Sequence, residues 1–104
     1  MITEGCFFTY KGDKGIAISF TVPKGWKGRR YPALAPTQYI LRSWKNGILE
    51  EGDYTYLYHR DVLSKLNREE IRRELGDNAV LLCWEKTGFC HRHLVVEWLN
   101  GEIK

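Results

Sequence analysis

The apolar stretch Ala79–Cys83 (AVLLC) constrains the fold of this chain more than any other segment. It lacks the alternation of apolar and polar residues that marks a strand with one face in solvent. A continuous apolar run of this length is typical of a central strand that is covered on both faces. We therefore predict a sheet in which this strand lies between others.

Two further strands are predicted near the N-terminus. Residues 6–10 and 16–22 are rich in β-forming side chains and are bounded by glycine or proline. The segment between them, 11–15, either closes a hairpin or forms an irregular excursion. After the second strand, Pro23–Pro36 is predicted to be an ordered loop, because Trp26 and Tyr31 give it side chains that can pack.

Capping residues and the helical spacing of apolar side chains predict four helices. Asn67, followed three residues later by Glu70, resembles a capping box and predicts a helix over Arg68–Leu75 that stops at Gly76. The remaining helices are predicted after the N-cap Thr37 (ending at Asn46 and Gly47), after the N-cap Asp53, and over about Cys90–Asn100, with Leu94, Val95, Trp98 and Leu99 buried.

At 104 residues, of which 43% are hydrophobic, the chain is expected to form a single domain over residues 1–104. Strands at the N-terminus, and a strand, loop and helix at the C-terminus, predict an α/β fold. Because helices separate the last strand from the first ones, we expect them to pair in parallel. The expected architecture is a small layered domain with a short, partly parallel sheet flanked by helices.

Charge and cysteine content narrow the class of protein. The net charge of +3 tolerates an anionic partner but falls short of the strongly basic stripe of a nucleic-acid-binding protein. Three cysteines do not form the ladder of a secreted disulfide scaffold, and the first residues do not resemble a signal peptide. The longest apolar run is too short to cross a bilayer. We expect a cytoplasmic protein with free thiols, no cofactor and no membrane partner.

Polar residues crowd the turn that follows the predicted central strand. Ligands of open α/β sheets lie beyond the carboxyl ends of the strands, so we expect this turn to lie close to Thr9, Tyr10 and the loop segment from Pro23 to Tyr31. The N-terminus of the last helix offers unpaired N–H groups, and Arg92 adds a bidentate donor for phosphate. The turn therefore predicts an anion site, unless Glu85 itself caps the helix and pairs with Arg92.

The cysteines of the turn suggest a second chemistry. Cys90 is the candidate nucleophile, because a helix N-terminus and neighbouring His91 favour its thiolate; the alternative is a plain buried cysteine. Cys83 is expected to be buried at the end of its strand. Both cysteines and His91, completed by His93 or Cys6, are zinc-type ligands. However, Cys-x6-Cys-His is an unusual zinc spacing, and adjacent helical residues point about 100° apart, so no metal site is predicted.

The segment Lys24–Tyr31 (KGWKGRRY) interleaves cations with aromatic rings. This composition predicts a surface that stacks on a base while the cations hold phosphate. The alternative is a solvated basic loop whose aromatic rings fold into the core. The candidate ligand-binding residues of the whole chain are Arg92, Trp26, Arg29, Arg30, Tyr31, Thr9, Tyr10 and Cys83.

Three segments near the C-terminus carry a family resemblance: Leu81–Glu85 (LLCWE), Phe89–His93 (FCHRH) and Glu97–Leu99 (EWL). They resemble the C-terminal signature of the domain of unknown function 488 family, in its compact branch. The resemblance implies a small cytoplasmic bacterial or phage α/β protein and does not imply an activity. Signature positions fall on Cys83, Glu85, Cys90, His91 and Arg92, and further matches on Ser19, Pro23, Trp26, Gly28, Tyr31, Leu34–Pro36, Tyr54, Tyr58 and Val62–Leu66.

These patterns lead to two main hypotheses. The first is a small enzyme that acts on a nucleotide or a nucleic-acid-derived substrate, with Glu85 as general acid or base and with Cys90 or His91 assisting. The second is a non-catalytic binding module, for example phage-encoded, that sequesters a nucleotide ligand or binds a partner protein. Both make a phosphate-bearing small molecule or nucleotide the expected partner, with nucleic acid as a further candidate. A redox or metal module built on Cys83 and Cys90 ranks last.

Overall fold

The computed structural model of the chain describes residues 1–85 and 88–101. None of the helices in these residues has the length and apolar character needed to span a membrane. The elements are the strands β1 (Thr3–Cys6), β2 (Gly15–Ala17), β3 (Arg29–Arg30) and β4 (Val80–Cys83), the helices α1 (Gln38–Lys45), α2 (Glu51–Asp61), α3 (Arg68–Leu75) and α4 (His91–Leu99), and the 3-10 turns η1 (Pro32–Leu34) and η2 (Leu63–Lys65).

The strands form one sheet in the order β1-β4-β2-β3, and every neighbouring pair is parallel. β4 pairs with β1, where Cys83 lies opposite Cys6, and with β2, where Leu82 lies opposite Ala17. The predictions of an α/β fold, a central last strand and parallel pairing are therefore confirmed. Because β4 separates β1 from β2, the segment 7–14 is not a hairpin and instead carries the chain back to the start of β2.

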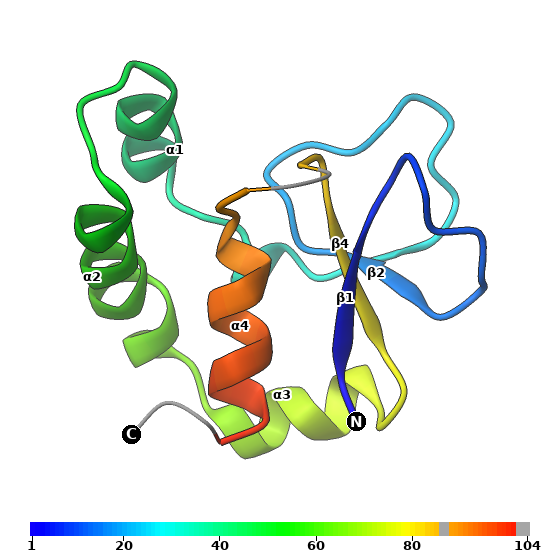
Figure 1. Cartoon of the computed structure of the whole chain (residues 1–104). Helices are drawn as coiled ribbons and strands as arrows, with labels where there is room; N and C mark the ends of the chain where they lie inside the picture. Colours follow the sequence, from blue (N-terminus) through cyan, green and yellow to red (C-terminus); the bar gives the residue numbers. More distant parts are fainter. Residues whose placement is uncertain (86–87, 102–104) are drawn as a thin grey trace.

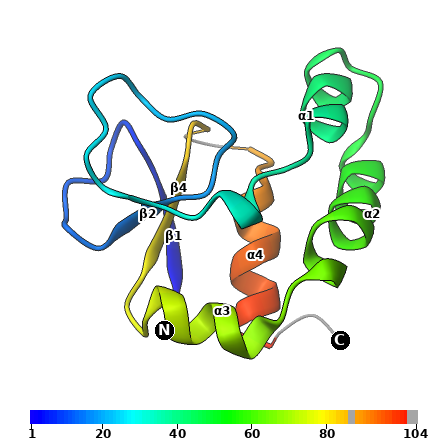
Figure 2. The ribbon, with the colours of Figure 1, turned by 180° about the vertical axis from the view of Figure 1, so that it is seen from behind.

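Helix α4 lies between the sheet and the α1–α2 pair, as both views of the ribbon show (Figures 1 and 2). It contacts β1 and β4 on one side and α2 on the other, and α3 contacts α4 near the amino ends of the strands. The side chain of Leu81 belongs to the core between sheet and helices, together with Val95 and Leu99 of α4. This packing places the start of α4 beside the end of β4.

On the other face of the sheet, the ring of Tyr10 packs beside Gly15 and Leu82. Gly5 and Gly15 leave room there for the side chain of Leu82, which is 1% exposed. A Cβ atom on Gly15 would lie 2.5 Å from Leu82 Cδ1 and 3.1 Å from Tyr10 Cε2. Leu81 and Leu82 are therefore both buried, on opposite faces, as the apolar run Ala79–Cys83 predicts.

Helix ends follow the predicted caps more closely than strand ends follow the predicted strands. Thr37 Oγ1 accepts the backbone N–H of Ile40 at 3.2 Å, and the helices predicted before Asn46, over 68–75 and at the C-terminus are confirmed. For α2 the N-cap is Glu50, and Asp53 closes the capping box from inside the helix. The strand predicted over residues 6–10 is wrong except at Cys6, because β1 precedes it at Thr3–Cys6. The strand predicted over 16–22 ends early, at Ala17, and the predicted loop 23–36 contains β3 and η1.

We predict that Gly15→Ala lowers the free energy of unfolding by about 1–3 kcal/mol, because the new methyl group overpacks the contact between Leu82 and Tyr10. Gly52→Ala is the matched control. A Cβ atom there meets nothing within 4 Å on the exposed side of α2, so the change is expected to stabilise the protein by up to about 1 kcal/mol. Urea denaturation measures both. Equal effects of the two substitutions would contradict this packing.

Candidate functional site

Segments that leave the carboxyl ends of three parallel strands are tied together at one edge of the sheet. After β1, the backbone N–H of Phe7 donates to the carbonyl oxygen of Cys83 at 3.1 Å. After β4, the indole Nε1 of Trp84 donates to the carbonyl oxygen of Thr21 at 3.1 Å, in the segment that follows β2. The expectation that a site gathers at this edge therefore agrees with the positions of these segments.

A cavity of about 190 Å³, called here the β4-end cavity, opens at this edge. It brings together a carboxylate, a thiol position, an imidazole and an ammonium group, beside two aromatic side chains. Of the residues predicted for the site, Cys83, Glu85 and His91 line it. The full lining is Ser19, Phe20, Thr21, Pro36, Leu41, Lys45, Cys83, Trp84, Glu85 and His91.

His91 is held in one orientation and one tautomer. Its Nε2 lies 2.7 Å from the carbonyl oxygen of Ile18, and because a carbonyl only accepts hydrogen bonds, Nε2 carries the proton. Burial lowers the pKa of His91 to about 4, so the ring is neutral at pH 7. The lone pair is then on Nδ1, which lies 3.6 Å from Cys90 Sγ. A neutral ring does not supply the positive charge that was expected to activate Cys90.

Arg92 is 4% exposed, and its guanidinium is bound by groups of the protein. Nε donates to Glu4 Oε1 at 3.0 Å, and Nη1 donates to Cys83 Sγ and to the carbonyl oxygen of Glu85, each at 2.7 Å. The prediction that Arg92 offers its guanidinium to an anion is thereby corrected, since Arg92 lines neither of the cavities described here. The pairing with Glu85 uses the backbone carbonyl, and the carboxylate partner is Glu4, which also contacts His93.

The sulfur atoms of Cys83 and Cys90 are in direct contact, as in a disulfide, and Cys6 is a buried free cysteine. The expectation of free thiols at all three positions is therefore not met in this arrangement. Cys90 is 4% exposed and is the N-cap of α4, but its side chain makes no hydrogen bond to the helix. Cys83 is 1% exposed, which confirms its predicted burial, although it also borders the β4-end cavity.

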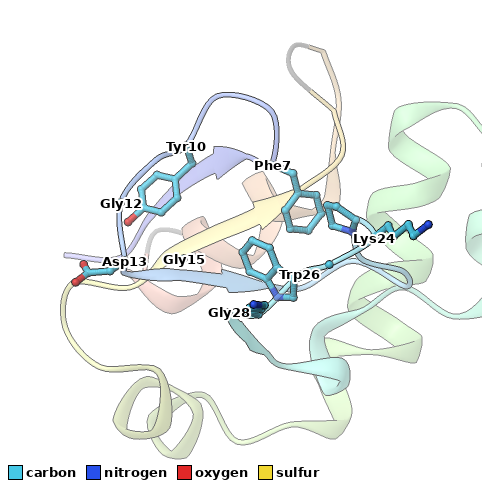
Figure 3. A pocket seen from close by; sticks show the side chains of 11 residues that line it. Phe7, Tyr10, Gly12, Asp13, Gly15, Lys24, Trp26 and Gly28 are labelled. Carbon is cyan, nitrogen blue, oxygen red and sulfur yellow. The ribbon is translucent and has the colours of Figure 1, made fainter.

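A second cavity, of about 350 Å³, lies beside the first and is called here the aromatic cavity. Figure 3 shows the rings of Phe7, Tyr10 and Trp26 around it, with Lys24 nearby. The Phe7 ring makes edge-to-face contacts with the rings of Trp26 and Trp84, with ring centroids 5.2 Å and 5.3 Å apart. Because Trp26 lines the aromatic cavity and Trp84 lines the β4-end cavity, Phe7 lies between the two cavities. We expected Tyr10, the basic loop and the turn after β4 to line one site. They instead line two separate cavities.

The basic segment itself is divided between the aromatic cavity and α3. Trp26 lines the cavity. Arg29 instead donates to the carbonyl oxygens of Glu74 (2.7 Å) and Leu75 (3.3 Å), and Tyr31 donates to Glu74 Oε2 at 3.1 Å. Arg29 and Tyr31 thus contact the end of α3 and line neither of these two cavities. Arg30 and Thr9 are exposed and line neither cavity.

Several lining residues of the β4-end cavity were not predicted: Ser19, Phe20, Thr21, Lys45 and Trp84. Three of them follow β2 directly. Their position was hidden because the second strand was predicted to continue to residue 22, which would make 19–21 part of the sheet. Had the strand been ended at Ala17, the rule that ligands lie beyond carboxyl ends would have pointed to them. Lys45 is the last residue of α1 and does not follow a strand, so this rule does not point to it.

Comparison with known proteins gives no match: no family model, no curated protein and no solved structure resembles this chain closely enough to indicate a relative. The resemblance to the domain of unknown function 488 family stays a prediction from the residues that carry it.

We predict that Arg92→Met lowers the free energy of unfolding by roughly 2–4 kcal/mol, because it leaves the groups that Arg92 binds without their donor. Arg60→Met is the control, since Arg60 is exposed and pairs with neighbouring Asp61; no measurable change is expected there. Chemical denaturation of both variants provides the test. A stable Arg92→Met protein would show that this guanidinium does not hold the turn together.

Proposed function

We propose that this chain is a small cytoplasmic enzyme that acts on a nucleotide-type or nucleic-acid-derived molecule in the β4-end cavity. One observation carries the proposal: the cavity joins the carboxylate of Glu85, the neutral ring of His91 and the ammonium group of Lys45 at the carboxyl edge of a parallel sheet. The proposed resemblance to the domain of unknown function 488 family is compatible with it, because signature residues Cys83, Glu85 and His91 border the cavity.

Three side chains of the cavity, those of Glu85, Lys45 and Trp84, support specific roles in this proposal. Glu85 is exposed to solvent and acts as general acid or base. Lys45 supplies the positive charge for a phosphate group, a task that Arg92 cannot perform while it binds Glu4. The ring of Trp84, fixed through its bonds to Thr21, offers a surface on which a base stacks.

The size of the cavity narrows the substrate further. About 190 Å³ is less than the roughly 300–1,000 Å³ of sites for drug-sized ligands. A single base or a sugar phosphate is the part that this volume suits, and the rest of a larger substrate would extend past the exposed side chain of Phe20. The proposed substrates are therefore bases, nucleosides, nucleotides and the exposed ends of nucleic acids.

We predict that Glu85→Gln abolishes turnover of a substrate found by screening bases, nucleosides and nucleotides, and leaves the melting temperature nearly unchanged. The substitution removes proton transfer but keeps the size of an exposed side chain. Thermal shift detects ligands, and mass spectrometry of the recovered ligand detects reaction. Glu97→Gln, at an exposed position of α4, is the control and should keep full activity. Ligands that bind but are always recovered intact would contradict an enzyme.

A second candidate, a non-catalytic binding module, is favoured by the aromatic cavity. Trp26, Tyr10 and Phe7 line it together with Lys24 and Lys27. Rings beside ammonium groups can stack on a base and hold its phosphate without any acid or base catalyst. Such a site would sequester a nucleotide, as the alternative prediction from the sequence requires.

Two variants decide which cavity a nucleotide occupies. If it binds the aromatic cavity, Trp26→Leu should weaken binding by roughly 5- to 150-fold, since stacking on one aromatic ring contributes roughly 1–3 kcal/mol. Lys45→Ala should then leave binding unchanged, because Lys45 lines only the β4-end cavity among the two. Calorimetric titration with the same nucleotide measures both. The reverse pattern would place the ligand in the β4-end cavity and support the enzyme.

A further inference from the structure

Two cysteines and one histidine form a buried cluster where β4 ends and α4 begins. The Sγ atoms of Cys83 and Cys90 and a ring nitrogen of His91 all lie within 4.8 Å of one another. The three residues are 1%, 4% and 5% exposed. Thiolate and imidazole are the ligands that zinc prefers in proteins. In the part of the chain that the structure describes, this is the one such group.

The histidine presents its free nitrogen to the cluster. Nε2 of His91 is occupied by the carbonyl oxygen of Ile18 at 2.7 Å, so the lone pair is on Nδ1, on the side of Cys90. Histidines that bind metals commonly donate their other N–H to a carbonyl in this way, which fixes the ring and its tautomer. The distance from Nδ1 to Cys90 Sγ is 3.6 Å, close to the roughly 3.6 Å that tetrahedral bonds to one zinc ion require.

The backbone at Cys90 explains how neighbouring residues converge. The sequence predicts no metal site partly because Cys90 and His91, if both lay in the helix, would have side chains that diverge by about 100°. Cys90 is the N-cap, with φ −152° and ψ 146°, and only His91 has entered α4. The divergence expected for two helical neighbours therefore does not apply to this pair, and Cys90 Sγ lies 3.6 Å from Nδ1 of His91.

Charge and backbone spacing favour an ion between the sulfurs. Arg92 Nη1 donates to Cys83 Sγ at 2.7 Å, a contact that would stabilise the thiolate form that a metal ligand needs. With both cysteines as thiolate ligands, a divalent cation would balance their buried negative charge. The Cα atoms of Cys83 and Cys90 are 7.8 Å apart, beyond the roughly 4.4–6.8 Å usual for disulfides. The backbone thus spaces the two residues for a shared metal ion, once their side chains rotate to admit it.

We propose that Cys83, Cys90 and His91 bind one Zn²⁺ ion, with the fourth coordination position toward the β4-end cavity. Cys83 and His91 both line this cavity, and Glu85 Oε2 lies 3.3 Å from Cys83 Sγ on the same side. Three protein ligands and one open position are the pattern of reactive zinc sites, whereas structural sites use four protein ligands. The proposal does not rest on the proposed function, because metal binding is measured without a substrate.

The metal alone tests the site. Protein purified without chelator should contain close to one zinc per chain by elemental analysis. After reduction and removal of metal with a chelator, titration with Co²⁺ should produce a thiolate-to-cobalt charge-transfer band and the intense visible bands of tetrahedral coordination. Zn²⁺ should then displace the Co²⁺. These measurements use the unaltered chain, so they decide the question even if a variant fails to fold.

Variants show which residues hold the ion. Cys83→Ser, Cys90→Ser and His91→Gln should each weaken Co²⁺ binding by more than the roughly 10- to 100-fold that loss of an outer partner costs. Cys6→Ser and His93→Gln are matched controls and should bind Co²⁺ like the unaltered chain, because neither residue belongs to the cluster. The Cys6 thiol donates to the Trp84 carbonyl, and the ring of His93 contacts Glu4 and the Gly88 carbonyl.

Three results would overturn the proposal. The first is reduced protein that shows no cobalt–thiolate band and carries no zinc. The second is protein in which Cys83 and Cys90 form a disulfide and, after reduction, take up no metal. The third is binding that survives both cysteine substitutions or disappears in Cys6→Ser, since either would place the metal elsewhere.

Discussion

The parallel pairing of β4 with both β1 and β2 is the constraint on which the rest of the structure depends. Parallel strands send their carboxyl ends to one edge, so the segments after Cys6, Ala17 and Cys83 must share that edge. β4 lies between β1 and β2 and is covered on both faces, so Leu81 is buried on one face and Leu82 on the other. Helix α4 then packs on the face that carries Leu81, with Val95 and Leu99 in the same core, and brings its first residues beside the end of β4.

Arg92 shows how the edge is held together and why its charge is not available to a ligand. The guanidinium joins Glu4 of β1, the Cys83 sulfur of β4 and the carbonyl of Glu85 in the following turn. A buried guanidinium is tolerated only when its donors are paired, and the protein itself provides the acceptors. Among the residues that the structure describes, the cationic side chain in the lining of the β4-end cavity is that of Lys45, at the end of α1. The chemistry of the site thus depends on a contact between segments that are distant in sequence.

Helix boundaries could be predicted because a cap is a local interaction. Thr37 and Asn67 accept backbone N–H groups three residues ahead, so their type and spacing are sufficient evidence. Strand boundaries could not be predicted in this way, because β-forming residues are compatible with a strand but do not determine where its hydrogen-bonded pairing ends. Residues 7–10 have such a composition, yet the N–H groups of Thr9 and Tyr10 turn back to the carbonyl of Cys6. The same kind of error at the second strand, predicted to end at residue 22 and observed to end at Ala17, concealed the cavity lining provided by residues 19–21.

By itself the sequence determined the α/β class, the buried central strand and the capped helices, and it made the turn from Cys83 to Arg92 the candidate site, because periodicity, capping and polarity are properties of neighbouring residues. Only the tertiary structure decided which way the side chains of that turn point. Arg92 turns inward because Glu4 of another strand meets it there. Cys90 and His91 converge because the helix begins between them and Ile18 fixes the ring. These orientations are set by partners far along the chain, which a local pattern does not contain.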